Sequence, residues 1–255
     1  MTSDVSPVRR VQRVRHDIVR REVAVATATP LGQDFVRVVF QGPALAGFIS
    51  LGFDDHVKLL FELPGQPEPA RRDYTPRAWN PERQELTVDF AMHGQGVASD
   101  WARHAQPGHK LVIAGPRGSM VVPTDYDWHL LIGDASAAPA MARRLAELPA
   151  GTRVIVLAQL ADPSVLNLQA SPAQVSLQQA DAPEALYAMA EALPLPAGEG
   201  YVWAAGEASA MARLRDLLLV DKGHPREAAR IAAYWRRGTA EFHEELSQPV
   251  PPAAG

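Results

Sequence analysis

The sequence contains no cysteine. This absence excludes disulfide bonds, thiolate-bound metals and cysteine-held iron–sulfur clusters from the chemistry of the chain. If the protein transfers electrons, it must therefore use an organic cofactor or a metal held by other side chains.

Long apolar runs are also missing. No stretch approaches the ~20 residues that a membrane-spanning helix requires, and the first residues lack the apolar centre of a secretory signal. We therefore expect a cytoplasmic protein that does not insert into a membrane. The net charge of −4 argues against nucleic acid as the main partner, because proteins that bind nucleic acid usually present a basic surface.

Enough hydrophobic residues are present for a substantial core. The 255 residues are 47% hydrophobic and 21% charged, which suits one large domain or two ordinary domains. Residues 1–21 hold six arginines between Arg9 and Arg21, opposed by Asp17. We expect a solvated basic arm or a short helix here, and contact with an acidic partner or ligand is the alternative.

Short β-rich runs, separated by glycine and proline, follow the arm. They occupy residues 22–29, 35–41, 56–62, 85–91 and 110–114. This spacing predicts a small antiparallel β-barrel over residues 22–124.

The second half alternates strands and helices. Strands are predicted at 128–132, 152–159, 173–179 and 201–205, with helices up to residue 148, at 183–193 and after Glu207. Such alternation predicts a parallel-sheet α/β domain over residues 125–222, with ligands at the carboxyl ends of its strands. Two strands end at glycine turns, Gly133 and Gly206, but the sequence lacks a G-x-G-x-x-G motif. An α/β domain with ordinary structural turns is therefore the alternative.

Residues 223–255 are predicted to form a helical extension and a disordered tail. We expect helices at 225–234 and 239–246, with Trp235 at their junction. The proline-rich residues from Gln248 onward are typical of disorder.

Residues 71–77, Arg-Arg-Asp-Tyr-Thr-Pro-Arg, combine cations with an aromatic ring. Pro76 favours an extended backbone at Thr75, and in an extended chain Arg72 and Tyr74 point to one face, roughly 7 Å apart. A flavin dinucleotide suits this pair. Arg72 would bind its pyrophosphate, Tyr74 would lie against the isoalloxazine, and the Thr75 hydroxyl would reach a ring nitrogen. The alternative is a surface loop with solvated arginines.

A glycine turn at residues 94–96 precedes a short amphipathic helix that ends near His104. Backbone amides at such a turn approach anions closely, so we expect the amides after Gly96 to form the second half of a pyrophosphate clamp. His93 is either a phosphate donor or a solvated histidine at a strand end. Trp101 is expected to pack against the core, because a helix this short needs an apolar anchor.

Several motifs follow one another in a fixed order: Asp55-His56-Val57-Lys58, Arg72-x-Tyr74-Thr75-x-Arg77, His93-Gly94 with Gly96, Ser99 and Trp101, Ala114-Gly115-Pro116-Arg117-Gly118, Gly133-Asp134, Gly206-Glu207 and Tyr234-Trp235-x-x-Gly238. In this order they resemble the siderophore-interacting proteins, also called ferric-siderophore reductases, a branch of the ferredoxin–NADP reductase superfamily. The resemblance covers roughly residues 20–246. The chain departs from the family pattern after Gly-Asp, where Ala135 and Ser136 replace the usual acidic residue and threonine.

The resemblance implies a two-domain fold, an antiparallel flavin-binding β-barrel followed by a parallel-sheet nicotinamide-binding domain. It implies FAD as the cofactor, NADPH or NADH as the electron donor, and a ferric siderophore as the substrate, whose iron is released as Fe(II) in the cytoplasm. Since the cofactor carries the chemistry, no catalytic side chain and no protein-bound metal is expected. We also expect a monomer.

The resemblance also assigns residues to ligands. Lys58 and Arg77 are candidates for binding the ferric siderophore, with a solvated strand lysine as the alternative for Lys58. Trp235 is expected to cover one edge of the site or to pack structurally. The expected FAD residues are Arg72, Tyr74, Thr75, Arg77, Asp89, Phe90, His93, Gly94, Gly96, Val97, Ala98 and Ser99, and those near the nicotinamide cofactor are Gly133, Asp134, Ala135, Ser136, Gly206 and Glu207.

Two other functions are consistent with the same residues. A general flavin or electron-carrier reductase would use the same cofactors. A siderophore-binding flavoprotein without nicotinamide turnover would account for the altered turn at Ala135 and Ser136.

Overall fold

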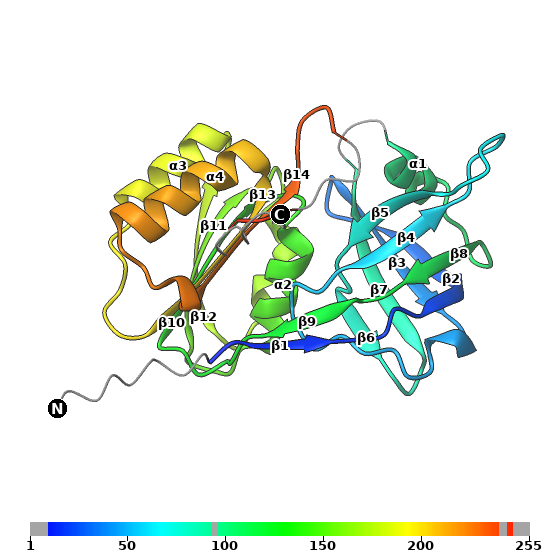
Figure 1. Cartoon of the computed structure of the whole chain (residues 1–255), viewed down its shortest axis with the longest axis horizontal. Coiled ribbons are helices and arrows are strands. Elements are labelled where there is room, and N and C mark those ends of the chain that lie inside the picture. Colours follow the sequence, from blue (N-terminus) through cyan, green and yellow to red (C-terminus); the bar gives the residue numbers. More distant parts are fainter. Residues whose placement is uncertain (1–9, 93–95, 240–243, 247–255) are drawn as a thin grey trace, which may run out of the picture.

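The computed structural model describes residues 10–92, 96–239 and 244–246. Two parts lie side by side in Figure 1: an antiparallel sheet that curls round its own core, and a parallel sheet flanked by helices. This is the predicted order, β-barrel first and α/β domain second. None of the helices in these ranges combines the length and apolar character needed to cross a bilayer.

The barrel is a seven-stranded antiparallel sheet. Successive side chains of a strand point to opposite faces, so alternate residues enter the core. Val38, Phe40, Val88 and Phe90 are 0% exposed there. In sheet order the strands are β5 (Ala70–Tyr74), β4 (Val57–Phe61), β8 (Lys110–Ala114), β2 (Arg20–Leu31), β3 (Phe35–Gln41), β7 (Glu85–Ala91) and β6 (Ala78–Asn80).

The barrel strands predicted from the sequence are confirmed to within two residues at each end. β5 confirms the extended backbone on which the Arg72–Tyr74 interpretation depends. The short helix α1 (Val97–Arg103) packs on the barrel core. Its Trp101 ring lies 5.7–6.0 Å from three phenylalanine rings, which confirms the predicted packing role; these are Phe40, Phe61 and Phe90.

The basic arm contributes a strand. β1 (Gln12–Arg15) pairs antiparallel with β9 (Gly118–Val121), so the helix considered for this segment does not form. A 3-10 turn, η1 (Pro43–Leu45), lies between β3 and β4. Residues 1–9 lie outside the described ranges.

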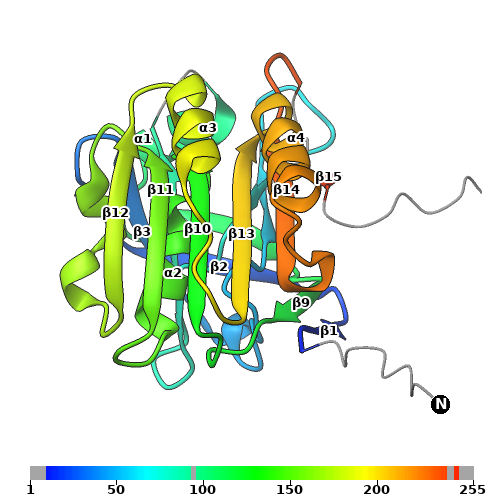
Figure 2. The same ribbon diagram turned by 90° about the vertical axis from the view of Figure 1, so that its left-hand side faces the viewer.

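The α/β part is a six-stranded sheet in the order β12-β11-β10-β13-β14-β15, parallel except for the last strand. α2 lies between this sheet and the barrel, whereas α3 and α4 cover the opposite face (Figures 1 and 2). The strands are β10 (Trp128–Asp134), β11 (Arg153–Gln159), β12 (Gln174–Ala180), β13 (Gly200–Glu207), β14 (Ala229–Trp235) and β15 (Glu244–Glu245). The helices are α2 (Ala138–Glu147), α3 (Pro183–Ala192) and α4 (Ala208–Asp216), with shorter helical segments η2 (Pro163–Leu166), η3 (Leu168–Ala170), η4 (Leu217–Asp221) and η5 (Arg226–Ala228).

The predicted C-terminal helices are wrong. Residues 229–235 form β14, which pairs parallel with β13 and buries Arg230, Ile231, Ala232 and Ala233 together. A short continuous apolar run cannot be distinguished from a helix by its periodicity alone, and here the free edge of β13 pairs with it. The described part of the second predicted helix is also extended, as β15, while residues 240–243 and the predicted disordered tail from Gln248 lie outside the described ranges.

A buried carboxylate joins the two domains. Asp54, in the loop before β4, accepts a hydrogen bond from Trp203 Nε1 at 2.9 Å and pairs with Arg230 Nε at 2.5 Å. Asp54 is 2% exposed and Arg230 8% exposed. Because both partners of Asp54 belong to the parallel sheet, this cluster fixes the barrel against it.

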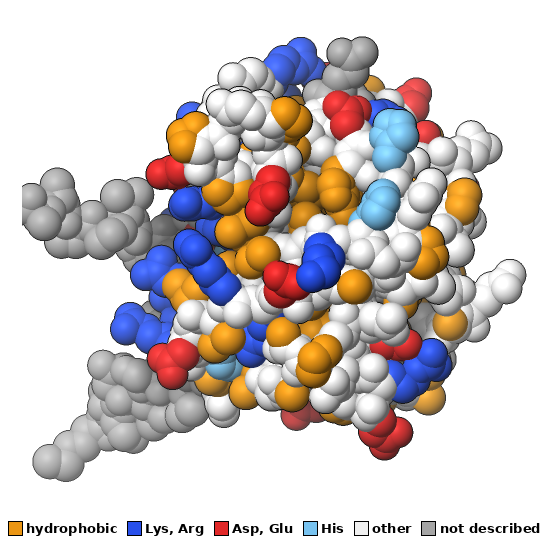
Figure 3. Space-filling view, turned by 90° about the vertical axis from the view of Figure 1, so that its right-hand side faces the viewer, with side chains coloured by type: hydrophobic (Ala, Val, Ile, Leu, Met, Phe, Trp, Pro, Cys, Tyr) orange, Lys and Arg blue, Asp and Glu red, His pale blue; other side chains and the backbone are white. Residues whose placement is uncertain are grey.

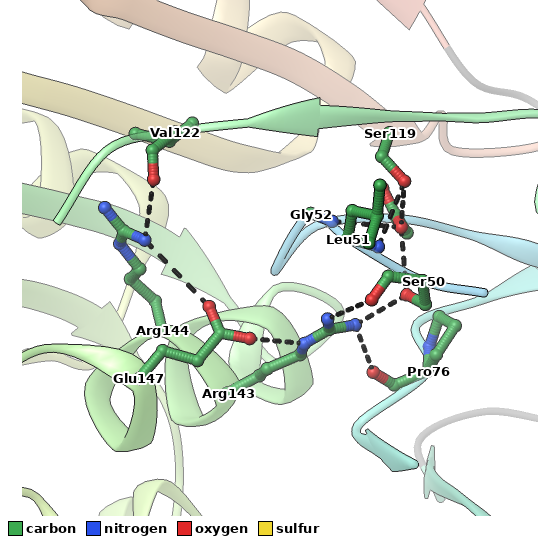
Figure 4. Close-up of polar contacts among 10 residues, drawn as sticks. Ser50, Leu51, Gly52, Pro76, Ser119, Val122, Arg143, Arg144 and Glu147 are labelled. Carbon is green, nitrogen blue, oxygen red and sulfur yellow. Dashed lines mark hydrogen bonds and ion pairs between the residues drawn. The ribbon is translucent and has the colours of Figure 1, made fainter. Parts of the chain in front are cut away.

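A second set of contacts runs from α2 to the barrel (Figure 4). Arg143 Nη1 donates to Ser50 Oγ at 2.8 Å and to Pro76 O at 2.9 Å, and its Nη2 donates to Ser50 O at 3.0 Å. The next residue, Arg144, places its guanidinium 5.1 Å from the centre of the Phe53 ring. Helix α2 is thus tied to two separate barrel loops.

We predict that Asp54→Ala lowers the free energy of unfolding by about 3–5 kcal/mol, because it leaves a buried guanidinium short of one carboxylate. Urea denaturation measures this loss. Asp125→Ala is the control, since Asp125 also pairs with an arginine, Arg10, but its side chain is 76% exposed. The control is expected to lose less than about 1 kcal/mol, and equal losses in the two variants would contradict the assignment of Asp54 as the domain joint.

Candidate functional site

A cavity of about 290 Å³ lies between the two domains. β5, β7 and the start of α1 supply its barrel wall, and residues that follow β10, together with the end of β14, supply the α/β wall. Most of the predicted cofactor residues that are described meet here. Its lining is Phe35, His56, Arg72, Asp73, Tyr74, Thr75, Asp89, Ala91, Gly96, Val97, Ala98, Ser99, Ala135, Ser136, Pro139, Tyr234 and Trp235.

β5 delivers the aromatic and the cationic group to the cavity. Arg72 pairs with Leu59 of β4, and Tyr74 pairs with Val57, so the two side chains lie on one face of the strand as predicted. The Tyr74 ring leans on Phe90, with 4.5 Å between ring centres. Burial raises the pKa of the Tyr74 phenol above its ordinary value, although the charge of Arg72 opposes this. The phenol therefore stays neutral and supplies a flat surface beside a cation.

The start of α1 forms a second part of the wall, through Gly96, Val97, Ala98 and Ser99. Among the described residues, no side chain caps this helix. The Ser99 hydroxyl donates instead to Gly96 O at 2.9 Å. Backbone amides of the first turn are thus available at the cavity. His93 and Gly94, the other expected residues of this turn, lie outside the described ranges.

Asp89, Phe90 and Arg77 support the cavity in different ways. Asp89 lines it and holds Arg37 through two bonds, from Nε at 2.7 Å and Nη2 at 2.8 Å. Arg77 lies 3.9 Å from the same carboxylate but is not part of the cavity wall, and burial lowers its pKa. Phe90 is fully buried and packs against the Tyr74 ring.

The α/β wall is built at the point where the strand order reverses, between β10 and β13. Open parallel sheets bind ligands in the crevice at such a point. Asp134, at the end of β10, accepts hydrogen bonds from Ser136 N at 2.9 Å, Glu207 N at 3.1 Å and Trp235 Nε1 at 2.8 Å. One carboxylate therefore fixes the turn after β10, the end of β13 and the indole at the end of β14.

This arrangement separates residues that face the cavity from residues that hold them. Ala135, Ser136 and Trp235 line the cavity. Gly133, Asp134, Gly206 and Glu207 lie together at the strand ends but are not part of its wall. A Cβ at Gly133 would lie 2.5 Å from both the Ala137 Cβ and the Ala205 carbonyl oxygen, and Glu207 accepts hydrogen bonds from the first amides of α4.

A second, larger cavity of about 600 Å³ adjoins the first and is basic. Four arginines line it: Arg13 and Arg15 of β1, Arg117 just before β9, and Arg230 of β14. His56 belongs to the walls of both cavities. Figure 3 shows Lys and Arg side chains gathered along one side of the barrel face. The lining is Arg13, Val14, Arg15, His16, Asp17, Ile18, Asp54, Asp55, His56, Arg117, Gly118, Ser119, Met120 and Arg230.

Asp55 lies at the base of this second cavity and is 3% exposed. It accepts from Ser119 Oγ at 2.6 Å, from Ser50 Oγ at 2.9 Å and from Gly52 N at 3.1 Å. Burial raises the pKa of this carboxyl, and those hydrogen bonds lower it in part. Asp55 is thus a structural acceptor that connects Ser119 of β9 to the loop held by Arg143.

Sequence reasoning missed most of the second cavity. Lys58, the predicted substrate residue, instead forms an ion pair with Asp73 at 3.0 Å and is in neither cavity wall. His56 and Arg117 belonged to recognised motifs without receiving a role. Arg13 and Arg15 stood in the basic arm; both are exposed, and both line the second cavity.

Comparison with known proteins gives a consistent match along the chain. The family model described as the siderophore-interacting FAD-binding domain matches residues 24–71 and 62–120. The model described as the siderophore-interacting protein matches residues 126–238. The two models meet at the division between the barrel and the α/β part.

Individual relatives match over most of their length. The NADPH-dependent ferric-chelate reductase of Escherichia coli is 37% identical over 245 residues, covering 88% of this chain and 96% of the relative. A ferric vibriobactin reductase of Vibrio cholerae is 29% identical, over 84% of this chain and 89% of the relative.

Solved structures agree in fold. A siderophore utilization protein from T. fusca superposes with a TM-score of 0.81 at 30% identity, covering 91% of this chain and 98% of its own. The siderophore-interacting protein SipS from Aeromonas hydrophila gives a TM-score of 0.77 at 27% identity, with 89% and 94% covered.

Two glycines of the site, Gly133 and Gly96, differ in the space that an added methyl group would find. Gly133→Ala is expected to lower the free energy of unfolding by about 3 kcal/mol, because its Cβ has no space between α2 and β13. Gly96→Ala is the matched variant, since a Cβ there meets Ser99 Oγ at 3.7 Å, an ordinary contact. Its expected cost is about 0.5 kcal/mol, from the weaker N-cap. Urea denaturation of both variants checks the difference, and a reversed order would contradict it.

Proposed function

The chain belongs to the siderophore-interacting protein family, and we propose that it is a ferric-siderophore reductase. It takes electrons from a nicotinamide cofactor, passes them through FAD and reduces the Fe(III) of a siderophore. The observation that carries this proposal is the meeting of Arg72, Tyr74 and the first turn of α1 with Trp235 in one cavity between the two domains. We also propose that the reaction takes place in the cytoplasm and that the protein is a monomer.

The residues of the first cavity fit FAD. A guanidinium and the first-turn backbone of α1 face the same space as an aromatic ring and Thr75, a residue that is 6% exposed. We assign the pyrophosphate to Arg72 and the amides after Gly96, and the isoalloxazine to Tyr74 and Thr75. His93 and Gly94 stay part of this proposed set, with Asp89 and Phe90 as its supports. When bound, FAD accepts a hydride and gives electrons singly, which Fe(III) requires.

The crevice between β10 and β13 is the proposed site of the nicotinamide cofactor. Ala135 and Ser136 present the turn to it, and the carboxylate of Asp134 holds that turn and the Trp235 indole in place. Gly133, Gly206 and Glu207 allow the strand ends to come close enough for this. We propose NADPH as the donor, since the Escherichia coli relative is NADPH-dependent by name.

The second cavity is the proposed site of the ferric siderophore. Its arginines suit an anionic chelate, and its shared wall at His56 brings the chelate next to the flavin cavity. Siderophores bind hard Fe(III) through oxygen donors and hold Fe(II) less well, so reduction itself releases the metal. The protein therefore needs to bind, orient and separate its ligands. Lys58 and Arg77, outside both walls, are assigned supporting roles through Asp73 and Asp89.

An anaerobic titration tests this function. NADPH is added to purified protein loaded with FAD, the bleaching of the flavin is followed by absorbance, and a ferric siderophore is then added with a chelator that traps Fe(II). Return of the flavin absorbance together with Fe(II) capture is expected. Reoxidation by free flavin but not by the ferric siderophore would favour a general flavin reductase. Failure of both NADPH and NADH to bleach the flavin would favour a siderophore-binding protein without turnover.

We predict that Arg72→Ala weakens FAD binding by about 1.5–3 kcal/mol, the value of a hydrogen bond to a charged group. Equilibrium dialysis of FAD against the apoprotein measures this change. Arg71→Ala is the control, because Arg71 is the adjacent arginine on the same strand, is not part of the cavity wall and pairs with Glu68. Equal FAD affinity in the two variants would overturn the pyrophosphate assignment.

Tyr74→Ala is expected to shift the flavin absorbance bands and to weaken FAD binding by about 1 kcal/mol, through loss of the aromatic contact. Tyr74→Phe keeps the ring and is expected to behave like the wild type. Visible spectra and FAD affinities of the two variants check this. A Tyr74→Ala protein with the wild-type spectrum would rule out contact between this ring and the isoalloxazine.

A further inference from the structure

The strand β15 places a carboxylate on an arginine of the basic cavity. It pairs antiparallel with β14, and Leu246 N donates to Ile231 O at 2.7 Å. This pairing brings Glu245 Oε2 to 3.2 Å from Arg230 Nη1. Arg230 lines the second cavity, so Glu245 contacts a residue of the cavity wall without being part of that wall itself.

Arg230 is held by two carboxylates in different environments. Asp54 contacts its Nε at 2.5 Å with a side chain that is 1% exposed, and belongs to the domain joint. Glu245 contacts Nη1 with a side chain that is 18% exposed. Burial alone lowers the pKa of Arg230, but the two carboxylates outweigh it, so the pKa is raised and the guanidinium remains charged. Its positive charge is balanced first by Asp54, and Glu245 adds a second negative charge.

We infer that Glu245 is an internal anion that competes with the negatively charged ferric chelate for Arg230 and so reduces the preference of the cavity for highly charged chelates. The inference depends on the proposed function for the identity of the ligand. Glu245 lies beyond the residues matched by the family model, which end at 238.

Electrostatics gives the direction of the effect. A carboxylate paired with an arginine of the cavity wall offsets part of that arginine's attraction and repels each negative charge of an entering chelate, and the repulsion grows with the charge of the chelate. A neutral chelate does not feel this repulsion. Removing the charge of Glu245 should therefore make the binding free energy more favourable by an amount that grows with the chelate's negative charge. Arg13, Arg15 and Arg117 continue to attract the chelate.

Glu244 provides a matched control. It is the neighbouring residue of the same two-residue strand and is also a glutamate. Its carboxylate pairs with Arg236 at 3.7 Å, and its side chain is 51% exposed. Arg236 is not in the wall of the second cavity. Glu244→Gln thus changes the net charge by the same amount as Glu245→Gln without changing the charge at Arg230.

Binding of redox-inert gallium chelates tests the inference without turnover. Wild type, Glu245→Gln and Glu244→Gln, each loaded with FAD, are titrated calorimetrically with a triply negative Ga(III) tris-catecholate and with a neutral Ga(III) tris-hydroxamate. We expect Glu245→Gln to lower the Kd of the tris-catecholate by about five- to tenfold at low salt. The Kd of the neutral complex, and both Kd values of Glu244→Gln, are expected to stay within a factor of two of the wild type, roughly the scatter of independent rim sites.

Three results would overturn the inference. Equal tightening in the two variants would assign the effect to net charge. Equal changes for the charged and the neutral complex would indicate a structural change in the cavity. An unchanged Kd for the tris-catecholate in Glu245→Gln, with a melting temperature close to wild type, would show that Glu245 does not compete.

Failure of the proposed function gives a different pattern. If the wild type binds the Ga(III) complexes but does not reduce ferric siderophores, the reductase assignment is overturned and the inference stands. If the wild type reduces ferric siderophores but both variants bind Ga(III) tris-catecholate like the wild type, the inference is overturned and the reductase assignment stands. Absence of any Ga(III) binding overturns the inference, while the anaerobic titration decides the function independently.

Discussion

The buried carboxylate of Asp54 is the interaction on which the geometry of both cavities depends. It lies in a barrel loop, yet its partners Trp203 and Arg230 are side chains of the parallel sheet. Each cavity takes its wall from both domains, so a small rotation between the domains would separate the residues of each site. A rotation between the domains would pull apart this buried ion pair and its hydrogen bond. Such a separation is costly because water cannot reach the buried charges to solvate them. The same loop continues into Asp55 and His56, which belong to the second cavity and to the shared wall.

Local patterns were sufficient to predict most of the architecture. Alternating and continuous apolar runs identified the barrel strands and the βαβ order, because those patterns follow directly from which faces a strand or helix buries. The C-terminal region was predicted wrongly for the same reason. The run around Ile231 is apolar on both faces, and only its pairing with β13, fixed by tertiary structure, makes it a strand. β1 was missed because its exposed arginines carry no apolar period and its partner β9 lies far along the chain.

The site divides in a similar way. Arg72 and Tyr74 could be placed on one face because they are two residues apart on one strand, and the turn at Gly96 could be recognised from its own local glycines. The second cavity could not, since Arg13, Arg117 and Arg230 come from separate elements and meet only in the folded chain. Asp134 shows a further limit. Its position at a strand end suggested a ligand contact, but its hydrogen bonds to Ser136, Glu207 and Trp235 are all internal, and no local pattern distinguishes a carboxylate that binds a ligand from one that positions those that do.

The shared wall at His56 has a kinetic consequence. Among the described residues, His56 is the one side chain that both cavities have in common. Under the proposed function, the nicotinamide cofactor enters the crevice at the α/β domain, and the iron chelate enters from the side of β1 and β9. The two reactants therefore do not compete for the same entrance, and the oxidised donor need not depart before the acceptor arrives. Such an arrangement favours a ternary complex, in which the interval between accepting and delivering electrons is short and reduced flavin has little opportunity to react with dioxygen.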